Sequence, residues 1–471
     1  MSGPFHLPDR NLRFCWWLLP LMIALTAPLG AAEVDVASPN SLAVYRLIIN
    51  STLTDSYAYE RLGELCDTIG HRLSGSPRLN AAVAWAMDTM QKDGFDKVWS
   101  EPFLAPHWVR GNESAEVTHP ISFPLTIIGL GPSVGTPPGG IEAELLAVSD
   151  FAELKARSAE ATGRIVLFDP VWDGYGRTVL YRRDGASAAA LHGAVACLIR
   201  SMTDYSLNTP HTGMMVYADS VPKIPAAAVT VEDAGRLHRM ASKGLFPRVR
   251  LHMSAQTFPD TEVANVIGEI RGREKPEEIV LVAAHLDSWD TGTGAHDDGA
   301  GCAIVLAAAR QLKVLDLIPR RSLRVVLYGC EEFGRIAGNA YHDAHKDEIA
   351  QHVAALECDS GGFAPDGFSV RGDSVVVAKV AELAAPLKIL GADKVREGWS
   401  GVDIYPLVEE GVPGIGHRTH SENYFHYHHS PADTFDKIDP DALAKNVAAV
   451  AALIYALAED PISLRSLAGV Q

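Results

Sequence analysis

Apolar runs and apolar helical stretches alternate along the second half of this 471-residue chain. Residues 278–284, 322–328 and 354–357 are runs rich in Val, Ile, Leu and Ala, typical of buried parallel strands. Residues 300–312 and 442–457 have the apolar content and length of packed helices. Strands that alternate with helices predict an α/β fold, a doubly wound and mostly parallel sheet flanked by helices.

The first half of the chain has a different pattern. Residues 41–95 place apolar side chains at helical spacing on both sides of a turn-rich loop at 70–77. Further on, short apolar runs alternate with Gly and Pro turns and one alanine-rich helical stretch. This pattern predicts a smaller, β-rich domain inserted into the α/β domain. The predicted order is residues 33–119 for the N-terminal part of the α/β domain, 120–260 for the insert and 261–465 for the remainder.

The N-terminus has the layout of a signal peptide. Arg10 and Arg13 precede an apolar run at 14–29, and small residues follow at 30–32. The alternative is an uncleaved membrane anchor, but the run is shorter than the about 20 residues that a span needs, and two prolines interrupt it. We therefore expect residues 1–32 to be removed from an exported protein that is secreted or periplasmic, or secreted or lysosomal in a eukaryote.

Composition narrows the class of protein further. Apolar residues make up 47% and charged residues 21%, as in soluble globular proteins, and the formal net charge is −17. An acidic chain lacks the basic surface of a nucleic-acid binder, and we also expect no stable membrane insertion. Five cysteines follow the predicted signal peptide with no close pair spacing, which predicts buried free thiols.

Side chains that bind metals follow the predicted strands of the α/β domain. Five segments carry them: His285-Leu286-Asp287, His296-Asp297-Asp298, Glu331-Glu332, Asp359-Ser360-Gly361 and His428-His429-Ser430-Pro431-Ala432-Asp433-Thr434. The carboxyl ends of strands in such a sheet lie at one edge, where ligands bind. We expect the five segments to meet there.

The residue types suit a pair of zinc ions. Imidazole and carboxylate groups are zinc ligands, and two ions about 3.5–4 Å apart need one shared carboxylate and two further ligands each. One residue from each segment meets that need: His285, Asp297, Glu332, Asp359 and His429. The sequence thus predicts two Zn²⁺ per chain.

Two carboxylates remain beside the predicted ligands. Glu331 has the position of a general base that takes a proton from water. Asp287 shares a face with His285 in an extended stretch, so it can orient the imidazole or stiffen the adjacent backbone. Simpler explanations exist, since Asp297 or Asp298 can cap the helix at 300–312 and a Glu-Glu pair is often a solvated surface. Five such segments in one domain favour the metal site.

In order and type, these motifs resemble the two-zinc peptidases, a family that includes secreted bacterial aminopeptidases and glutamate carboxypeptidases. His-Leu-Asp, Asp-Asp-Gly-Ala-Gly, Glu-Glu, Asp-Ser-Gly and His-Ser-Pro-Ala-Asp-Thr occur here in that family's order. Residues 163–167 and 222–227 are similar to the protease-associated domain inserted in one branch. The resemblance implies the zinc-exopeptidase fold and covers nearly the whole mature chain.

The resemblance also implies a role for each ligand. His285 and Asp359 bind one zinc, Glu332 and His429 bind the other, and Asp297 bridges them.

Three neighbouring assignments follow from the same resemblance. Glu331 acts as base and then as acid. His429 is preferred to His428 because the family's ligand directly precedes the Ser or Thr of the final motif. His296 stands where the branch usually has an uncharged residue, which leaves open a perturbed site or an extra substrate contact.

The implied activity is hydrolysis of short unblocked peptides by a dipeptidase or carboxypeptidase, with an aminopeptidase of the same family as the close alternative. An exopeptidase needs a polar anchor for a free terminus. Arg418 can pair with a carboxylate and Asp403 or Glu422 can receive an ammonium group, while His428 is a further candidate for substrate contact.

Two other functions use the same fold. A non-catalytic binding protein would lose metal ligands, and a one-zinc cyclase would not need the complete bridging set, whereas all five predicted ligands are present here. The resemblance leaves a homodimer open. Asn50 and Asn112 lie in glycosylation sequons, which matter only in a eukaryotic source.

Overall fold

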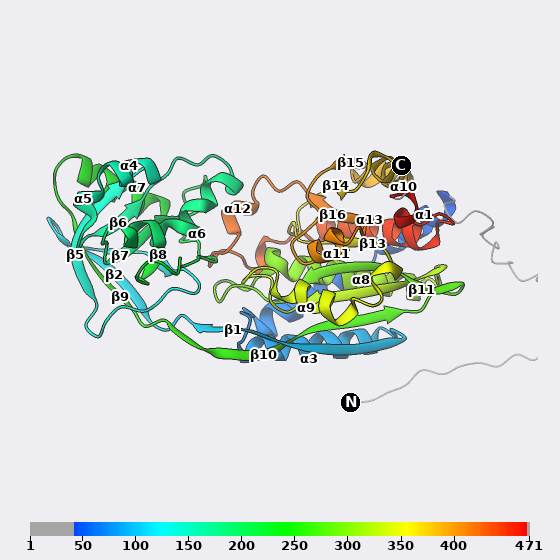
Figure 1. Cartoon of the computed structure of the whole chain (residues 1–471). Coiled ribbons are helices and arrows are strands. Elements are labelled where there is room, and N and C mark those ends of the chain that lie inside the picture. Colours follow the sequence, from blue (N-terminus) through cyan, green and yellow to red (C-terminus); the bar gives the residue numbers. More distant parts are fainter. Residues whose placement is uncertain (1–41, 469–471) are drawn as a thin grey trace, which may run out of the picture.

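A computed structural model describes residues 42–468, and the predicted signal peptide lies outside them. The chain forms two lobes, of which the larger combines residues from both ends of the described range (Figure 1). The smaller lobe is formed by the residues between them. Two long antiparallel strands, β1 (Lys97–Val109) and β10 (Gln256–Ile270), lead from the larger lobe towards the smaller one.

The larger lobe is built on an eight-stranded sheet of order β1–β10–β12–β11–β13–β16–β14–β15. Its remaining strands are β11 (Lys275–His285), β12 (Arg321–Tyr328), β13 (His352–Glu357), β14 (Pro365–Arg371), β15 (Lys394–Glu397) and β16 (Gly414–Thr419). The four central strands β12, β11, β13 and β16 are parallel, whereas β10 and β14 pair antiparallel with them. The apolar runs of β12 and β13 are buried along their whole length, as strands covered on both faces must be.

Helices cover both faces of this sheet. Asn265 of β10 donates a hydrogen bond to the Ala337 carbonyl of α9 (Ile336–His345) at 3.0 Å. Gly268 of β10 points to the other face, because side chains alternate along a strand, and packs against Met90 of α3 (Pro77–Lys92).

The central strands pack against α8 (Ala300–Val314) and α13 (Pro440–Glu459). The length and hydropathy of α13 would suffice for a membrane span, but 83% of its apolar window is buried within the protein. We therefore describe α13 as a core helix. The other helical segments of this lobe are α1 (Leu42–Thr52), α2 (Tyr57–Glu64), η1 (Leu65–Ile69), η2 (Ala295–Gly299), η3 (Ile349–Gln351), α10 (Ser374–Ala384), η4 (Ala385–Leu390), α11 (Tyr405–Glu409), α12 (Tyr424–Tyr427), η5 (Phe435–Lys437) and α14 (Leu464–Leu467).

The smaller lobe contains a second eight-stranded sheet, of order β3–β2–β9–β5–β6–β7–β8–β4. Its strands are β2 (Glu113–His119), β3 (Phe123–Leu125), β4 (Ile127–Gly129), β5 (Ile141–Val148), β6 (Ile165–Phe168), β7 (Ala196–Arg200), β8 (Ala226–Val229) and β9 (Arg248–Met253). Its helices are α4 (Phe151–Ala156), α5 (Ser158–Ala161), α6 (Tyr175–Leu191) and α7 (Val231–Ser242).

Aromatic rings join the two lobes. The rings of Trp172, which precedes α6, and of Tyr175, its first residue, lie 5.8 Å and 4.6 Å from the ring of Phe425 in α12. Figure 1 shows α12 in the space between the lobes. The insert thus packs beside the segment that leads to the predicted ligand His429.

The predicted α/β fold class is confirmed, and the five described cysteines are buried and free, as predicted. The insert contributes strands from Glu113 to Met253, whereas its predicted range is 120–260. The difference arises because β1 and β10 pair with each other up to Val109 and Gln256, so residue 260 still belongs to the larger sheet.

Candidate metal centre

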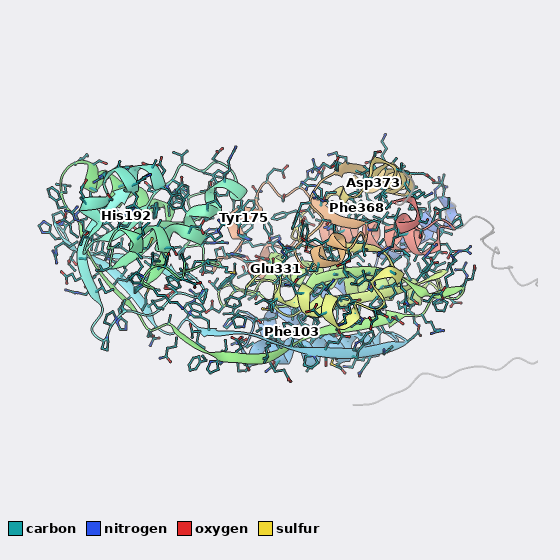
Figure 2. All side chains as sticks on the ribbon, viewed as in Figure 1. Phe103, Tyr175, His192, Glu331, Phe368 and Asp373 are labelled. Atoms are coloured by element: carbon teal, nitrogen blue, oxygen red, sulfur yellow. The ribbon has the colours of Figure 1, made fainter. Side chains whose placement is uncertain are left out.

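The strand register brings the predicted segments to one edge of the larger sheet. His285 at the end of β11 lies opposite Tyr328 at the end of β12, and Ala283 lies opposite Glu357 at the end of β13. The residues that follow these strands therefore leave the sheet side by side. Glu331 lies between the two lobes (Figure 2).

His285, Asp297 and Asp359 form one group of metal-binding side chains. The His285 Nε2 atom lies 3.2 Å from Asp297 Oδ1 and 3.8 Å from Asp359 Oδ1. The imidazole is oriented from behind, since its Nδ1 atom lies 3.1 Å from the Asp287 carbonyl oxygen. With that hydrogen bond made by Nδ1–H, the lone pair of Nε2 faces the two carboxylates, as in a metal-binding histidine.

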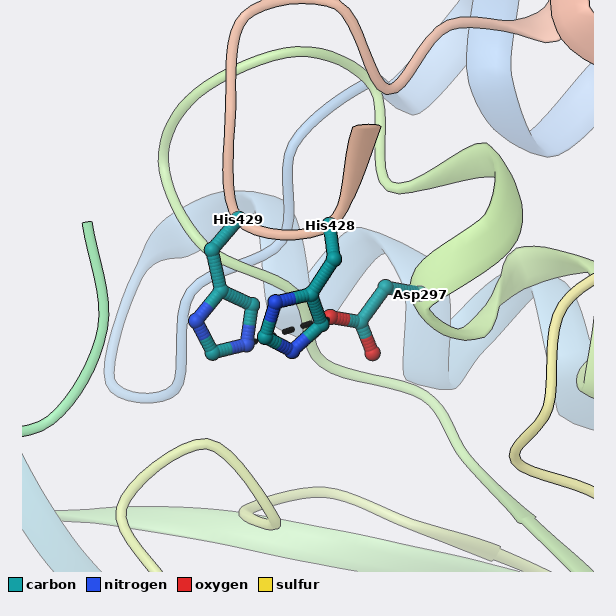
Figure 3. Close-up of side chains that lie close together, drawn as sticks. All are labelled: Asp297, His428 and His429. Atoms are coloured by element: carbon teal, nitrogen blue, oxygen red, sulfur yellow. Dashed lines mark ion pairs between the residues drawn. The ribbon is translucent and has the colours of Figure 1, made fainter. Parts of the chain in front are cut away.

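Asp297, Glu332 and His429 form a second group on the other oxygen of Asp297. The His429 Nε2 atom lies 3.1 Å from Asp297 Oδ2 and 3.0 Å from Glu332 Oε2. Figure 3 shows the contact of His429 with Asp297. A cavity of about 10 Å³ lies among these three side chains. Asp297 Oδ2 is buried and accepts no hydrogen bond despite the proximity of His429.

These observations fit a metal ion in each group. A buried carboxylate oxygen without a hydrogen bond is costly unless a cation compensates it. The donor set of two imidazoles and three carboxylates is one that zinc accepts.

The electrostatics of the site also favour bound metal ions. Burial raises the pKa of Glu331 well above its usual value, and the neighbouring carboxylates Glu332 and Asp359 raise it further. Burial alone would lower the pKa of His285, but contacts with Asp287, Asp297 and Asp359 raise it well above its usual value. The cluster therefore holds several buried acidic groups whose charge divalent cations would balance.

Further carboxylates hold the ligand segments in place. Asp287 accepts hydrogen bonds from the backbone N–H groups of Glu331 and Glu332, at 3.0 Å and 3.2 Å, so it stiffens the segment that carries the predicted base. Asp433 accepts hydrogen bonds from the N–H groups of His296 and Asp297, at 2.7 Å and 3.1 Å.

Asp298 links the end of β11 to the start of α8. It accepts hydrogen bonds from the N–H groups of His285 and Gly301, both at 3.1 Å. The bond from Gly301, in the first turn of α8, is the helix-capping contact considered for Asp298 in the sequence, whereas its bond from His285 and the role of Asp433 were not predicted.

His428 lies beside His429 without reaching Glu332. Their ring centroids are 3.5 Å apart, and His428 Nε2 is 3.6 Å from Asp297 Oδ2 (Figure 3). His429 alone of the pair contacts both Asp297 and Glu332. The geometry thus favours His429 as the ligand.

His296 is enclosed in a stack of rings. Its ring lies 4.3 Å from that of Phe363 and 5.6 Å from that of Tyr427, and its Nδ1 atom accepts a hydrogen bond from Gly362 N–H. Burial lowers its pKa to about 4, so the ring is neutral at neutral pH. His296 therefore adds no charge to the site.

Three of the predicted substrate anchors lie in different surroundings: on a cavity wall, in the protein interior and on the surface. Arg418 lines a cavity of about 90 Å³, whose wall also includes Asp359 and Ser400. Asp403 is buried behind it, and its N–H donates to Glu357 at 3.0 Å. Glu422 is exposed and lies 3.8 Å from His420.

Comparison with known proteins identifies the family. The sequence profile of Peptidase family M28 matches residues 265–454. Carboxypeptidase Q of Mus musculus is 44% identical over 430 residues, which cover 91% of this chain and 92% of that protein. The chain belongs to peptidase family M28. The predicted resemblance to this peptidase family is confirmed, and within the family the chain is similar to carboxypeptidase Q.

Solved structures of M28 proteins agree in fold. The peptidase M28 precursor from Shewanella amazonensis has a TM-score of 0.87 at 36% identity, covering 90% of this chain and 98% of that one. A zinc aminopeptidase from Bacillus subtilis has a TM-score of 0.66 at 20% identity, covering 87% and 97%, which shows the shared fold. As an M28 peptidase, the chain is a zinc metallopeptidase that acts on peptide substrates.

Proposed function

We propose that this M28 peptidase is a two-zinc exopeptidase that hydrolyses short unblocked peptides as a dipeptidase or carboxypeptidase. The observation that carries the proposal is Asp297, whose two oxygens each face a different group of ligands. In the proposal, His285 and Asp359 hold one zinc, Glu332 and His429 hold the other, and Asp297 is shared.

Glu331 is the proposed general base. When bound, the zinc ions supply a Lewis acid for the scissile carbonyl and lower the pKa of water to about 7. Glu331 takes a proton from the attacking water and returns it to the leaving amine. Asp287 supports this step, because it fixes the backbone of Glu331 through a hydrogen bond at 3.0 Å.

Arg418 is the proposed anchor for the substrate carboxylate. Its Nε atom is buried without a hydrogen bond, and none of the described acidic residues forms an ion pair with it. The nearby carboxylate of Asp366 is already engaged by Lys394 and Arg396. A guanidinium group without a partner, on the wall of a cavity beside Asp359, suits a carboxylate that arrives with the substrate.

His428 is a second proposed substrate contact, because its ring lies at the edge of the ligand set without completing it. The proposal does not use Asp403, which is buried behind the cavity, or Glu422, which is exposed away from its lining.

An aminopeptidase of the same family is the second candidate. The shared fold with the Bacillus subtilis zinc aminopeptidase supports it, whereas the 44% identity with carboxypeptidase Q and the unpaired Arg418 favour the first candidate. The pattern of residues 1–32 supports export of the enzyme in either case.

One dipeptide in three forms tests the choice. Alanyl-leucine with free ends, with an acetylated amine and with an amidated carboxylate would be assayed by release of leucine or leucinamide. A carboxypeptidase tolerates acetylation but not amidation, a dipeptidase tolerates neither, and an aminopeptidase tolerates only amidation. Cleavage of the amidated form as fast as the free form would contradict the proposal.

Arg418→Met links this preference to the cavity. A hydrogen-bonded ion pair is worth about 1.5–3 kcal/mol, so we expect kcat/KM for the free dipeptide to fall about 10–100-fold. Hydrolysis of the amidated form should be as slow in Arg418→Met as in the natural protein. Arg396→Met is the matched control, since Arg396 has its own carboxylate partner in Asp366. Equal losses for both substrates would remove Arg418 from recognition of the carboxylate.

A further inference from the structure

The insert reaches the metal centre through a buried arginine. Arg182 on α6 is only 6% exposed, and its Nη1 atom lies 3.2 Å from His429 Nδ1. None of the described carboxylates forms an ion pair with it. Its other contacts are neutral: the carbonyl oxygens of Thr212 and Met214, at 3.2 Å and 3.3 Å, and the hydroxyl of Tyr175, at 2.9 Å. A buried cation bonded only to neutral groups indicates a specific role, because burying an unpaired charge is costly.

The same segment of the insert holds both sides of His429. The Thr212 carbonyl oxygen lies 3.3 Å from His429 Nδ1, and the Thr212 N–H donates to the His429 carbonyl at 2.9 Å. His429 has a φ of 58°, a left-handed conformation that is unusual for a residue other than glycine and needs support from its surroundings. Thr212 supplies that support on the backbone and on the ring.

Arg182 keeps the Thr212 carbonyl in position. It donates to the carbonyls on either side of Gly213 and so fixes the direction of the peptide groups that meet His429. Gly213 has a φ of 136°, and a Cβ atom there would lie 2.2 Å from Arg182 Nη1 and 2.7 Å from His429 Nδ1. Any side chain larger than that of glycine at position 213 would therefore collide with both Arg182 and His429.

These contacts affect metal binding because the partners of Nδ1 decide which nitrogen of the His429 ring carries the proton. When Nδ1–H donates to the Thr212 carbonyl, Nε2 keeps its lone pair towards Asp297 and Glu332. In this tautomer Nδ1 cannot also accept from the guanidinium group, so Arg182 acts on the imidazole through the Thr212 carbonyl that it holds. Partners of this kind around a metal-binding histidine typically change metal affinity about 10–100-fold.

We propose that Arg182 of the insert is a positioning residue for His429, so that the insert completes the metal site formed by Glu332 and His429. The inference rests on the proposed two-zinc site. It predicts that the insert affects one of the two metal positions and not the other, since the described contacts of His285 and Asp359 do not involve Arg182.

Zinc titration of the metal-free protein against a competing chelator tests the proposal. For Arg182→Met we expect one zinc to bind as in the natural protein and the second to bind about 10–100-fold more weakly. The cobalt(II) form should show a changed visible spectrum for one ion only. Thermal unfolding of the metal-free protein reports any general loss of stability separately.

Two further variants keep the test decisive. Arg183→Met is the matched control, because Arg183 is the next residue on the same helix but is exposed and paired with Asp184. Arg182→Lys keeps the charge but cannot reach both the Thr212 and the Met214 carbonyls, so it should bind the second zinc several-fold more weakly than the natural protein. If Arg182→Met does not fold, the zinc titration of Arg182→Lys tests the proposal in its place.

Two equally tight zinc ions in the folded Arg182 variant would overturn the inference, as would equal weakening of both ions. A natural protein that binds fewer than two zinc ions would instead refute the proposed function. The two failures are therefore distinguishable.

Discussion

Glu331→Gln should retain both zinc ions and lose most of its turnover. The carboxamide keeps the size of Glu331 but cannot accept a proton from water, and general-base catalysis contributes about a hundredfold or more to such reactions. The backbone of residue 331 should stay in place, because Asp287 holds it through the N–H group rather than through the side chain. Steady-state hydrolysis of a free dipeptide and zinc content of the same sample are the two measurements.

The adjacent residue provides the contrast. Glu332 contacts His429 at 3.0 Å and lines the cavity of the second ligand group, so Glu332→Gln should weaken zinc binding instead of leaving it intact. Glu409→Gln, at an exposed site, should change neither quantity. Near-natural turnover in Glu331→Gln would exclude Glu331 as the base.

Asp297→Ala should lose both zinc ions and all measurable hydrolysis. Each ligand group contains one oxygen of this carboxylate, so its removal leaves only two protein ligands for each ion. Because zinc sites normally use three or four ligands, neither ion should survive dialysis. Zinc content after gel filtration, together with circular dichroism to check the fold, measures the outcome.

Asp436→Ala is the control for Asp297→Ala. Asp436 is an exposed acidic residue in the segment after the final motif and pairs with Lys437, so its loss should leave two zinc ions bound. An Asp297→Ala protein that still held two ions would show that the shared ligand is a different residue.

The sequence predicted three strands of the larger sheet, β11, β12 and β13, because their evidence is local, whereas β1, β10, β14, β15 and β16 were not predicted. Buried strands such as β12 and β13 are rich in Val, Leu and Ala, and the rule that ligands collect at strand ends places the residues that follow them. The five ligand residues were predicted from residue type and order, while their division between two metal positions came from the resemblance and stays a prediction. The limits of the insert were harder to predict, since β1 and β10 continue past the larger lobe with no break in composition.

Contacts between the lobes could not be read from the sequence. Arg182 and His429 are 247 residues apart, and nothing in the alanine-rich pattern of α6 indicates that one of its arginines meets a histidine of the metal centre. The preference for His429 over His428 rested on the resemblance alone, because adjacent histidines offer the same chemistry, and the contact of His429 with Glu332 gives it a geometric reason.

Diffraction data collected at the zinc edge from crystals of the natural protein test the central claim most directly. We predict two anomalous peaks about 3.5–4 Å apart, one between His285 and Asp359 and the other between Glu332 and His429, with Asp297 between the peaks. A single peak, or zinc bound away from Asp297, would contradict the two-zinc site on which the proposed reaction depends.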